Sequence, residues 1–114
     1  MSTKPKATAG SEILLEAHKL VNGPRQNDYG HPADDYRKVA DIYYALTGIN
    51  LEVSEAIMFM VAVKLARLTT NMDEGRWHRD SVVDAAGYLG CLNMVHEHIQ
   101  DLHDNAVTRF KDVP

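Results

Sequence analysis

The chain has 114 residues and a mass of 12.8 kDa, close to the commonest domain size, so no second hydrophobic core is expected. Hydrophobic residues make up 45% and charged residues 25% of the sequence, which argues against global disorder. The net charge of −4 and the pI near 5.8 argue against duplex nucleic acid as a partner, because DNA binding normally requires a clustered basic face.

Export and membrane insertion are not expected either. The longest apolar run extends from Ala56 to Val63, far short of the roughly 20 residues that span a bilayer. The basic N-terminus is not followed by an apolar signal segment. Cys91 is the only cysteine, which excludes an intrachain disulfide and a cysteine-based zinc site. We therefore expect a cytoplasmic protein without a membrane partner.

The hydrophobic periodicity predicts an all-α fold class, a compact four-helix domain over residues 11–105. Residues 1–10 lack this periodicity and are expected to form a flexible leader, and residues 106–114 a C-terminal tail. The first helix is predicted to begin near Ser11, and Gly23 followed by Pro24 ends it.

Two helices are predicted in the middle of the chain. Pro32 is a typical first-turn residue, so the second helix is expected from Pro32 to Leu46. Ser54 is the predicted N-cap of the third helix, which continues to about Thr70. Residues 57–63 leave no polar face over two turns, which predicts that this helix is central in the fold.

The fourth helix is predicted to begin with Asp80 or Ser81 as its cap and to continue to about Asp104. Gly87 and Gly90 interrupt it, and each glycine costs about 1 kcal/mol relative to alanine in a helix interior. Close approach of another helix is the simpler explanation for these glycines. Close approach of a ligand is the alternative.

Lys64 and Arg67 lie three residues apart at the end of the apolar stretch, so two cations share one face of the third helix. Such a pair can bind phosphate oxygens. Alternatively, both side chains extend to solvent at the C-terminal part of the helix, where its dipole favours cations.

Asp80 and Asp84 lie one turn apart on the fourth helix and therefore project from the same face. The two carboxylates can bind a hard divalent cation such as Mg²⁺ or receive the charges of Lys64 and Arg67. Apolar residues surround Asp84 in the sequence, so Asp84 is expected near the core, where a charge needs a partner.

The turn that precedes Pro32 contains Arg25, Tyr29, Gly30 and His31. Free backbone N–H groups at the start of a helix favour anions, so a phosphate could bind there. Acidic residues already occupy the first turn of the following helix, and a purely structural, capped turn is the alternative.

Three motifs in this order carry a family resemblance. Tyr29-Gly30 precedes a helix, Lys64-Leu65-Ala66-Arg67-Leu68 follows, and Asp80 to Tyr88 forms an acidic segment that ends in tyrosine. This order resembles a family of small uncharacterised proteins of tailed bacteriophages and is similar to the nucleotide-modification-associated domain one family. The resemblance covers roughly residues 12–95.

More distantly, the chain resembles the all-α nucleoside triphosphate pyrophosphohydrolases of the MazG and dimeric dUTPase type. Those enzymes hold Mg²⁺ with four carboxylates from two helices, and the Mg²⁺ activates water against nucleotide phosphates. The resemblance implies corresponding roles for Glu52 and Glu55 and for Asp80 and Asp84. The spacing of the second pair departs from the family pattern, and a cap at Ser54 would leave Glu52 outside the helix.

These observations predict a phage protein of nucleotide metabolism, similar to a Mg²⁺-dependent nucleotide pyrophosphohydrolase. Catalytic and metal-binding roles are expected for Glu55, Asp80 and Asp84. Phosphate binding is expected for Lys64, Arg67 and Arg25, and the ligand pocket is predicted to contain Tyr29, Gly30, His31, Gly87 and Tyr88.

Two alternatives remain open. The same residues could bind a nucleotide, or a signal derived from one, without turnover, as in a counter-defence protein. The charged residues could instead form a structural ion-pair network in a protein that acts through its surface. A homo-oligomer is expected, because related pyrophosphohydrolases are oligomeric and the third helix is more apolar than a monomer of this size requires.

Overall fold

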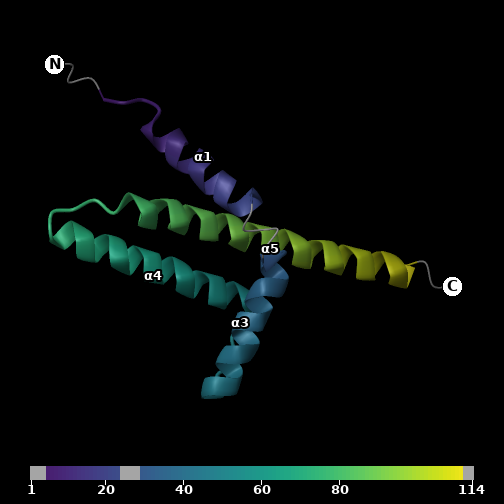
Figure 1. The fold of residues 1–114 in the computed structure, drawn as a ribbon. Helices are drawn as coiled ribbons and strands as arrows, with labels where there is room; N and C mark the ends of the chain where they lie inside the picture. Colours follow the sequence, from purple (N-terminus) through teal and green to yellow (C-terminus); the bar gives the residue numbers. More distant parts are fainter. Residues whose placement is uncertain (1–4, 24–28, 112–114) are drawn as a thin grey trace.

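The computed structural model describes residues 5–23 and 29–111, with side chains up to Val107. These residues form four helices and no strand (Figure 1). The helices are α1 (Ala9–Asn22), α3 (Pro32–Thr47), α4 (Val53–Asp73) and α5 (Arg79–Lys111). The predicted all-α fold class is therefore confirmed. No helix in the described ranges is long and apolar enough to cross a membrane.

Helices α4 and α5 form an antiparallel pair, and the other two helices pack against this pair. Figure 1 shows α4 beside the first half of α5, and α3 crossing near the start of α4. Helix α1 contacts α5, while α3 contacts both α4 and α5. The turn between α4 and α5 contains Gly75 with a φ of 76°, a left-handed conformation that glycine adopts without steric cost.

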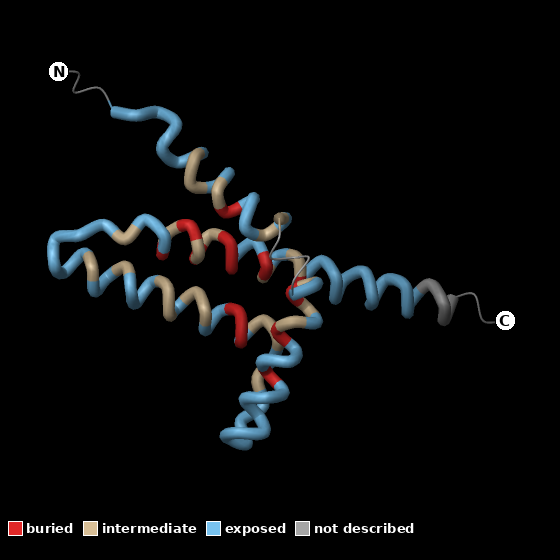
Figure 2. The backbone as a smooth tube through the Cα atoms, in the orientation of Figure 1, coloured by how far each residue is buried: buried red, intermediate tan, exposed pale blue. Residues whose placement is uncertain are grey.

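The hydrophobic core lies where α3, α4 and α5 meet. Figure 2 shows the buried positions gathered around this crossing and along the first half of α5, while the free ends of the helices are exposed. The rings of Tyr36 and Tyr88 meet edge to face, with centroids 6.3 Å apart. The core cluster consists of Tyr36, Ala56, Ile57, Tyr88, Cys91 and Val95.

Helix α3 begins at Pro32 as predicted and ends one residue later than expected, at Thr47. His31 is its N-cap, and the His31 Nδ1 accepts a hydrogen bond of 3.0 Å from the backbone N–H of Ala33. Gly48 ends the helix in the left-handed conformation, with a φ of 74°, and its N–H donates to the Tyr44 carbonyl.

Helix α4 begins two residues earlier than predicted, at Val53. Glu52 is the N-cap instead of Ser54, and it forms a reciprocal capping box with Glu55. The Glu55 carboxylate accepts the backbone N–H of Glu52 at 3.0 Å. The prediction of a Ser54 cap is therefore wrong, because the acidic residues on both sides satisfy the free N–H groups that a serine cap would have satisfied.

Helix α5 begins at Arg79, so Asp80 and Ser81 lie inside the helix and the predicted cap at either residue is wrong. The ring of His78 lies directly before the helix, with its Nδ1 2.5 Å from the buried Ser81 hydroxyl oxygen. The helix also continues to Lys111, beyond the predicted end at Asp104. No glycine or proline occurs between these two residues to stop it.

The arrangement is more open than the compact domain that the sequence predicts. Its extents are 73 × 36 × 22 Å and its radius of gyration is 18.4 Å, whereas about 13 Å is typical of a compact chain of this length. Helix α4 is buried only on the face toward α5 and α3. On its outer face, Met58 is 57% exposed and Phe59 65% exposed, because no other described helix covers them.

Candidate functional site: the Lys64 and Asp84 ion pair

An ion pair joins α4 to α5 beside the core. The Lys64 Nζ lies 2.9 Å from Asp84 Oδ2, and the two side chains are 15% and 31% exposed. Asp84 thus receives the charge of Lys64, which is one of the two roles that the sequence predicts for this carboxylate. An ammonium group has three N–H donors, and the pair with Asp84 occupies one of them.

Arg67 and Asp80 extend this line of charges toward the turn between the two helices. Arg67 lies three residues beyond Lys64 on α4, and Asp80 lies one turn before Asp84 on α5. Both residues are exposed, and within residues 5–23 and 29–107 neither side chain forms an ion pair. The site is therefore one partly buried ion pair flanked by one exposed cation and one exposed anion.

Glu55 does not join Asp80 and Asp84 within one chain. Its carboxylate is engaged at the N-terminus of α4, where it caps the Glu52 N–H. Among the side chains that the structure describes, no three histidine, cysteine, aspartate or glutamate residues lie close enough together to hold a metal ion. A single copy of the chain therefore does not provide the predicted three-carboxylate site for Mg²⁺.

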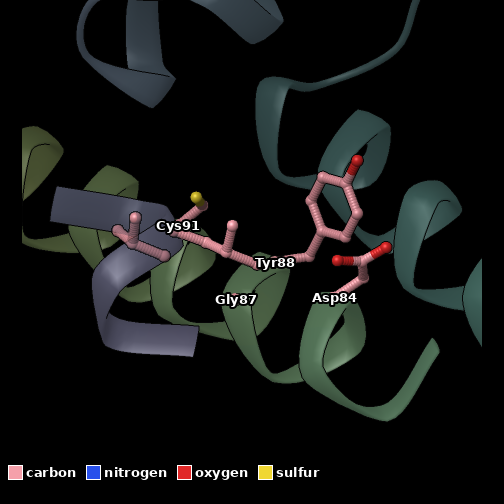
Figure 3. Close-up of a pocket in the computed structure, with 6 residues that line it drawn as sticks. Asp84, Gly87, Tyr88 and Cys91 are labelled. Carbon is pink, nitrogen blue, oxygen red and sulfur yellow. The ribbon is translucent and has the colours of Figure 1, made fainter. Parts of the chain in front are cut away.

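Gly87 and Tyr88 line a small cavity on the other side of Asp84, together with residues of α1. Figure 3 shows the labelled residues of this cavity along α5, with Asp84 and Tyr88 next to one another. Its volume is about 20 Å³, enough for one water molecule but not for a nucleotide. The cavity is lined by Leu20, Val21, Asp84, Gly87, Tyr88 and Cys91.

The two glycines of α5 lie opposite the end of α1. A Cβ atom at Gly87 would lie 3.7 Å from the Val21 Cγ2, and one at Gly90 would lie 4.0 Å from the same atom. These are ordinary van der Waals distances. Helix α1 therefore packs against this part of α5, but a Cβ atom would fit at both positions, so its approach does not by itself require glycine.

The predicted turn before α3 lies away from the ion pair. Tyr29 and Gly30 are exposed, and the His31 ring packs against the His98 ring with centroids 5.1 Å apart. His98 lies 14 residues after Asp84 on α5, which corresponds to about 21 Å along the helix axis. Arg25 lies outside the described residues.

Three polar contacts near α5 were not predicted from the sequence. His31 caps α3, His78 contacts the buried Ser81, and Arg79 forms an ion pair with Glu16 that ties α1 to α5. Ser81 is one of the two caps that the sequence predicts, and the histidine three residues before it is a signal for the contact between them. The ion pair between Arg79 and Glu16 depends on how α1 packs against α5. The cap of α3 is a histidine, a residue type that rarely caps helices.

The chain matches a family model described as Domain of unknown function (DUF6378) over residues 12–96. The chain belongs to this family. The segment matched to DUF6378 contains Lys64, Arg67, Asp80 and Asp84, as well as the whole of the core that Tyr36, Ala56, Ile57, Tyr88, Cys91 and Val95 form. The family domain thus comprises the core and the ion pair, whereas most of the exposed second half of α5 lies outside the match.

Two similar proteins come from mycobacteriophages, which confirms the predicted relationship to phage proteins. The Gene 55 protein of Mycobacterium phage D29 is 29% identical over 102 residues, which cover 90% of this chain and 65% of that protein. The Gene 55 protein of Mycobacterium phage L5 is 35% identical over 81 residues, which cover 70% of this chain and 49% of that protein. The chain thus spans about half to two thirds of these relatives. No solved structure matches it, and the likeness to pyrophosphohydrolases stays a prediction.

Proposed function

We propose that this DUF6378 protein binds the phosphate group of a nucleotide at Lys64 and Arg67, without hydrolysing it. The observation that carries this proposal is the state of the Lys64 ammonium. It is 15% exposed and lies 2.9 Å from Asp84 Oδ2, and an ammonium group has three N–H donors, of which one carboxylate oxygen takes one. A phosphate oxygen is a suitable acceptor for these donors.

Arg67 supplies a second cation for the same ligand. Residues three apart on a helix have Cβ atoms about 5–6 Å apart, so both side chains can reach one phosphate group. The Arg67 carbonyl accepts from Asn71, but its exposed guanidinium has no ion pair in the described ranges. Guanidinium groups bind phosphate with two parallel hydrogen bonds.

The carboxylates have matching roles in this proposal. Asp84 orients the Lys64 ammonium and compensates its charge while the site is empty. Asp80 is exposed one turn away and can accept hydrogen bonds from ribose hydroxyls or base amino groups. The choice of a nucleotide over other phosphorylated molecules rests on the resemblance of the Lys64 to Tyr88 motifs to nucleotide-associated families.

Metal-dependent hydrolysis of the same ligand is the competing candidate. It is favoured by the position of Asp80 and Asp84 on one face of α5. Within one chain, however, Asp84 is paired with Lys64 and Glu55 caps α4. Binding that does not require a metal is therefore the function that this geometry supports better.

Calorimetric titration with dATP, dGTP and pyrophosphate, each with EDTA and then with Mg²⁺, tests the proposal. We expect binding in EDTA and at least a tenfold weaker affinity in Arg67→Ala, because a charge-assisted hydrogen bond contributes roughly 1.5–3 kcal/mol. Arg37→Ala is the matched control, since Arg37 is an exposed arginine on α3.

Two results would overturn the proposal. The first is the absence of binding to any of the three probes at millimolar concentration, or an equal loss of affinity in Arg67→Ala and Arg37→Ala. The second is binding that occurs only with Mg²⁺ and is accompanied by phosphate or pyrophosphate release that Asp84→Asn abolishes, which would establish the hydrolase instead.

A further inference from the structure

The outer face of α4 carries a seam of residues with the spacing of a coiled-coil interface. Successive members lie four, three, four and three residues apart, which is the repeat that lets two helices pack side by side. All of them are exposed, and all but one are apolar. The polar member is Thr69, whose hydroxyl already donates to the Ala66 carbonyl at 2.9 Å. The seam consists of Met58, Ala62, Leu65, Thr69 and Met72.

An apolar groove between α3 and α4 continues this seam at its N-terminal end. Val39 and Tyr43 of α3 form one wall, while Met58 and Phe59 of α4 form the other. The groove has a volume of about 580 Å³. Seam and groove together give the molecule a mostly apolar surface that runs from α3 along α4, with Glu55 as the charged residue in the lining of the groove.

The total exposed surface is larger than that of a typical folded monomer of this mass. The accessible area is 8714 Å², whereas a folded monomer of this mass exposes about 6,300 Å². The difference of about 2,400 Å² is three times the roughly 800 Å² that each partner buries in a standard interface. The radius of gyration of 18.4 Å is likewise larger than the value of about 13 Å that is typical of a compact chain of this length. The exposed second half of α5 contributes to this excess, and the seam and the groove contribute to it along α4.

We propose that a second copy of the chain covers this surface, with the α4 seams of the two copies packed against each other about a two-fold axis. At such an axis the same patch meets itself, so like charges in the patch would repel one another. The seam contains no charged residue. Its regular spacing also lets identical helices interlock, because side chains of one seam fit between those of the other.

Light scattering coupled to size-exclusion chromatography tests this interface. The wild-type protein is expected at a mass of at least twice 12.8 kDa. Leu65→Glu should increase the dissociation constant at least tenfold and shift the mass toward that of one chain. Leu15→Glu is the matched control, since Leu15 is an exposed leucine on α1 outside the seam and should leave the mass unchanged.

A second measurement separates loss of the interface from loss of the fold. A photoreactive phenylalanine analogue at Phe59, which is exposed beside the seam, should crosslink two copies in the otherwise unchanged protein. The same analogue at Leu15 should give no such product. A monomeric wild-type protein at 100 µM, or equal masses for Leu65→Glu and Leu15→Glu with no crosslink at Phe59, would overturn the proposal.

Discussion

The two faces of α4 have similar composition but different surroundings. Ile57, on the inner face, is completely buried between α3 and α5, whereas the adjacent Met58 is more than half exposed on the outer face. Both belong to the same uninterrupted apolar run. An apolar run in the sequence therefore indicates a helix with apolar surface on several faces. It does not indicate which of these faces the rest of the same chain buries.

The largest expected effect is at the inner face. Ile57→Ala should lower the free energy of unfolding by about 2–5 kcal/mol, because it leaves a cavity among side chains that cannot fully collapse. Met58→Ala should cost less than about 1 kcal/mol when measured on dilute protein. Urea unfolding followed by circular dichroism gives both values. Equal losses for the two variants would contradict the distinction between the faces.

The next effect concerns the only charged contact of the inner face that the structure describes, between Lys64 and Asp84. Lys64→Met should cost about 1–2 kcal/mol, between the values for exposed and fully buried pairs. The double variant Lys64→Met/Asp84→Leu should recover part of this loss, since neither charge is then left without a partner. Arg76→Ala, which breaks an exposed pair with Glu74, is the control. Strictly additive losses at Lys64 and Asp84 would show that the pair is not coupled.

A smaller effect, in the stabilising direction, is expected on α5. A Cβ atom at Gly90 would meet only the Val21 Cγ2 at 4.0 Å, so Gly90→Ala should raise the free energy of unfolding by about 0.5–1 kcal/mol. Gly48→Ala should act in the opposite direction, because Gly48 has a φ of 74°. Thermal unfolding distinguishes the two. A destabilised Gly90→Ala protein would indicate that α1 packs more closely on α5 than described.

The smallest effect lies at the start of α1, far from α4. The Lys6 ammonium donates a 2.9 Å hydrogen bond to Glu12, which lowers the pKa of that carboxyl. A lowered pKa in the folded state contributes stability above the pKa of the unfolded chain and loses it as pH falls through the folded value. In Lys6→Ala the Glu12 pKa should rise, as measured by NMR titration, whereas Thr8→Ala should raise it less. An unchanged Glu12 pKa in Lys6→Ala would contradict the contact.

The sequence predicts most helix positions but not every helix end. Pro32 marks the start of α3, and the end at Thr47 differs by one residue from the prediction. In contrast, Ser54 belongs to a residue type that commonly caps helices, whereas Glu52 caps α4 through its reciprocal bond with Glu55. A short motif with two competing caps therefore leaves the boundary, and the role of Glu55, undecided.

The sequence identifies the residues of the candidate site, but it does not identify which of them contact one another. That Asp84 needs a cation follows from its apolar neighbours in the sequence. Whether Lys64 or Arg67 supplies the charge depends on the antiparallel register of α4 and α5, which no local pattern specifies. The distance between the turn at Tyr29 and the ion pair likewise follows from the place where α3 crosses α5.

The length of α5 has a consequence for how the protein loses structure. Its buried residues end at Val95, and every residue from His96 to Val107 is exposed. An isolated helix of about 12–15 residues is only marginally stable in water. The part of α5 beyond His98, whose ring still contacts His31, is therefore expected to unfold more readily than the part that lines the core.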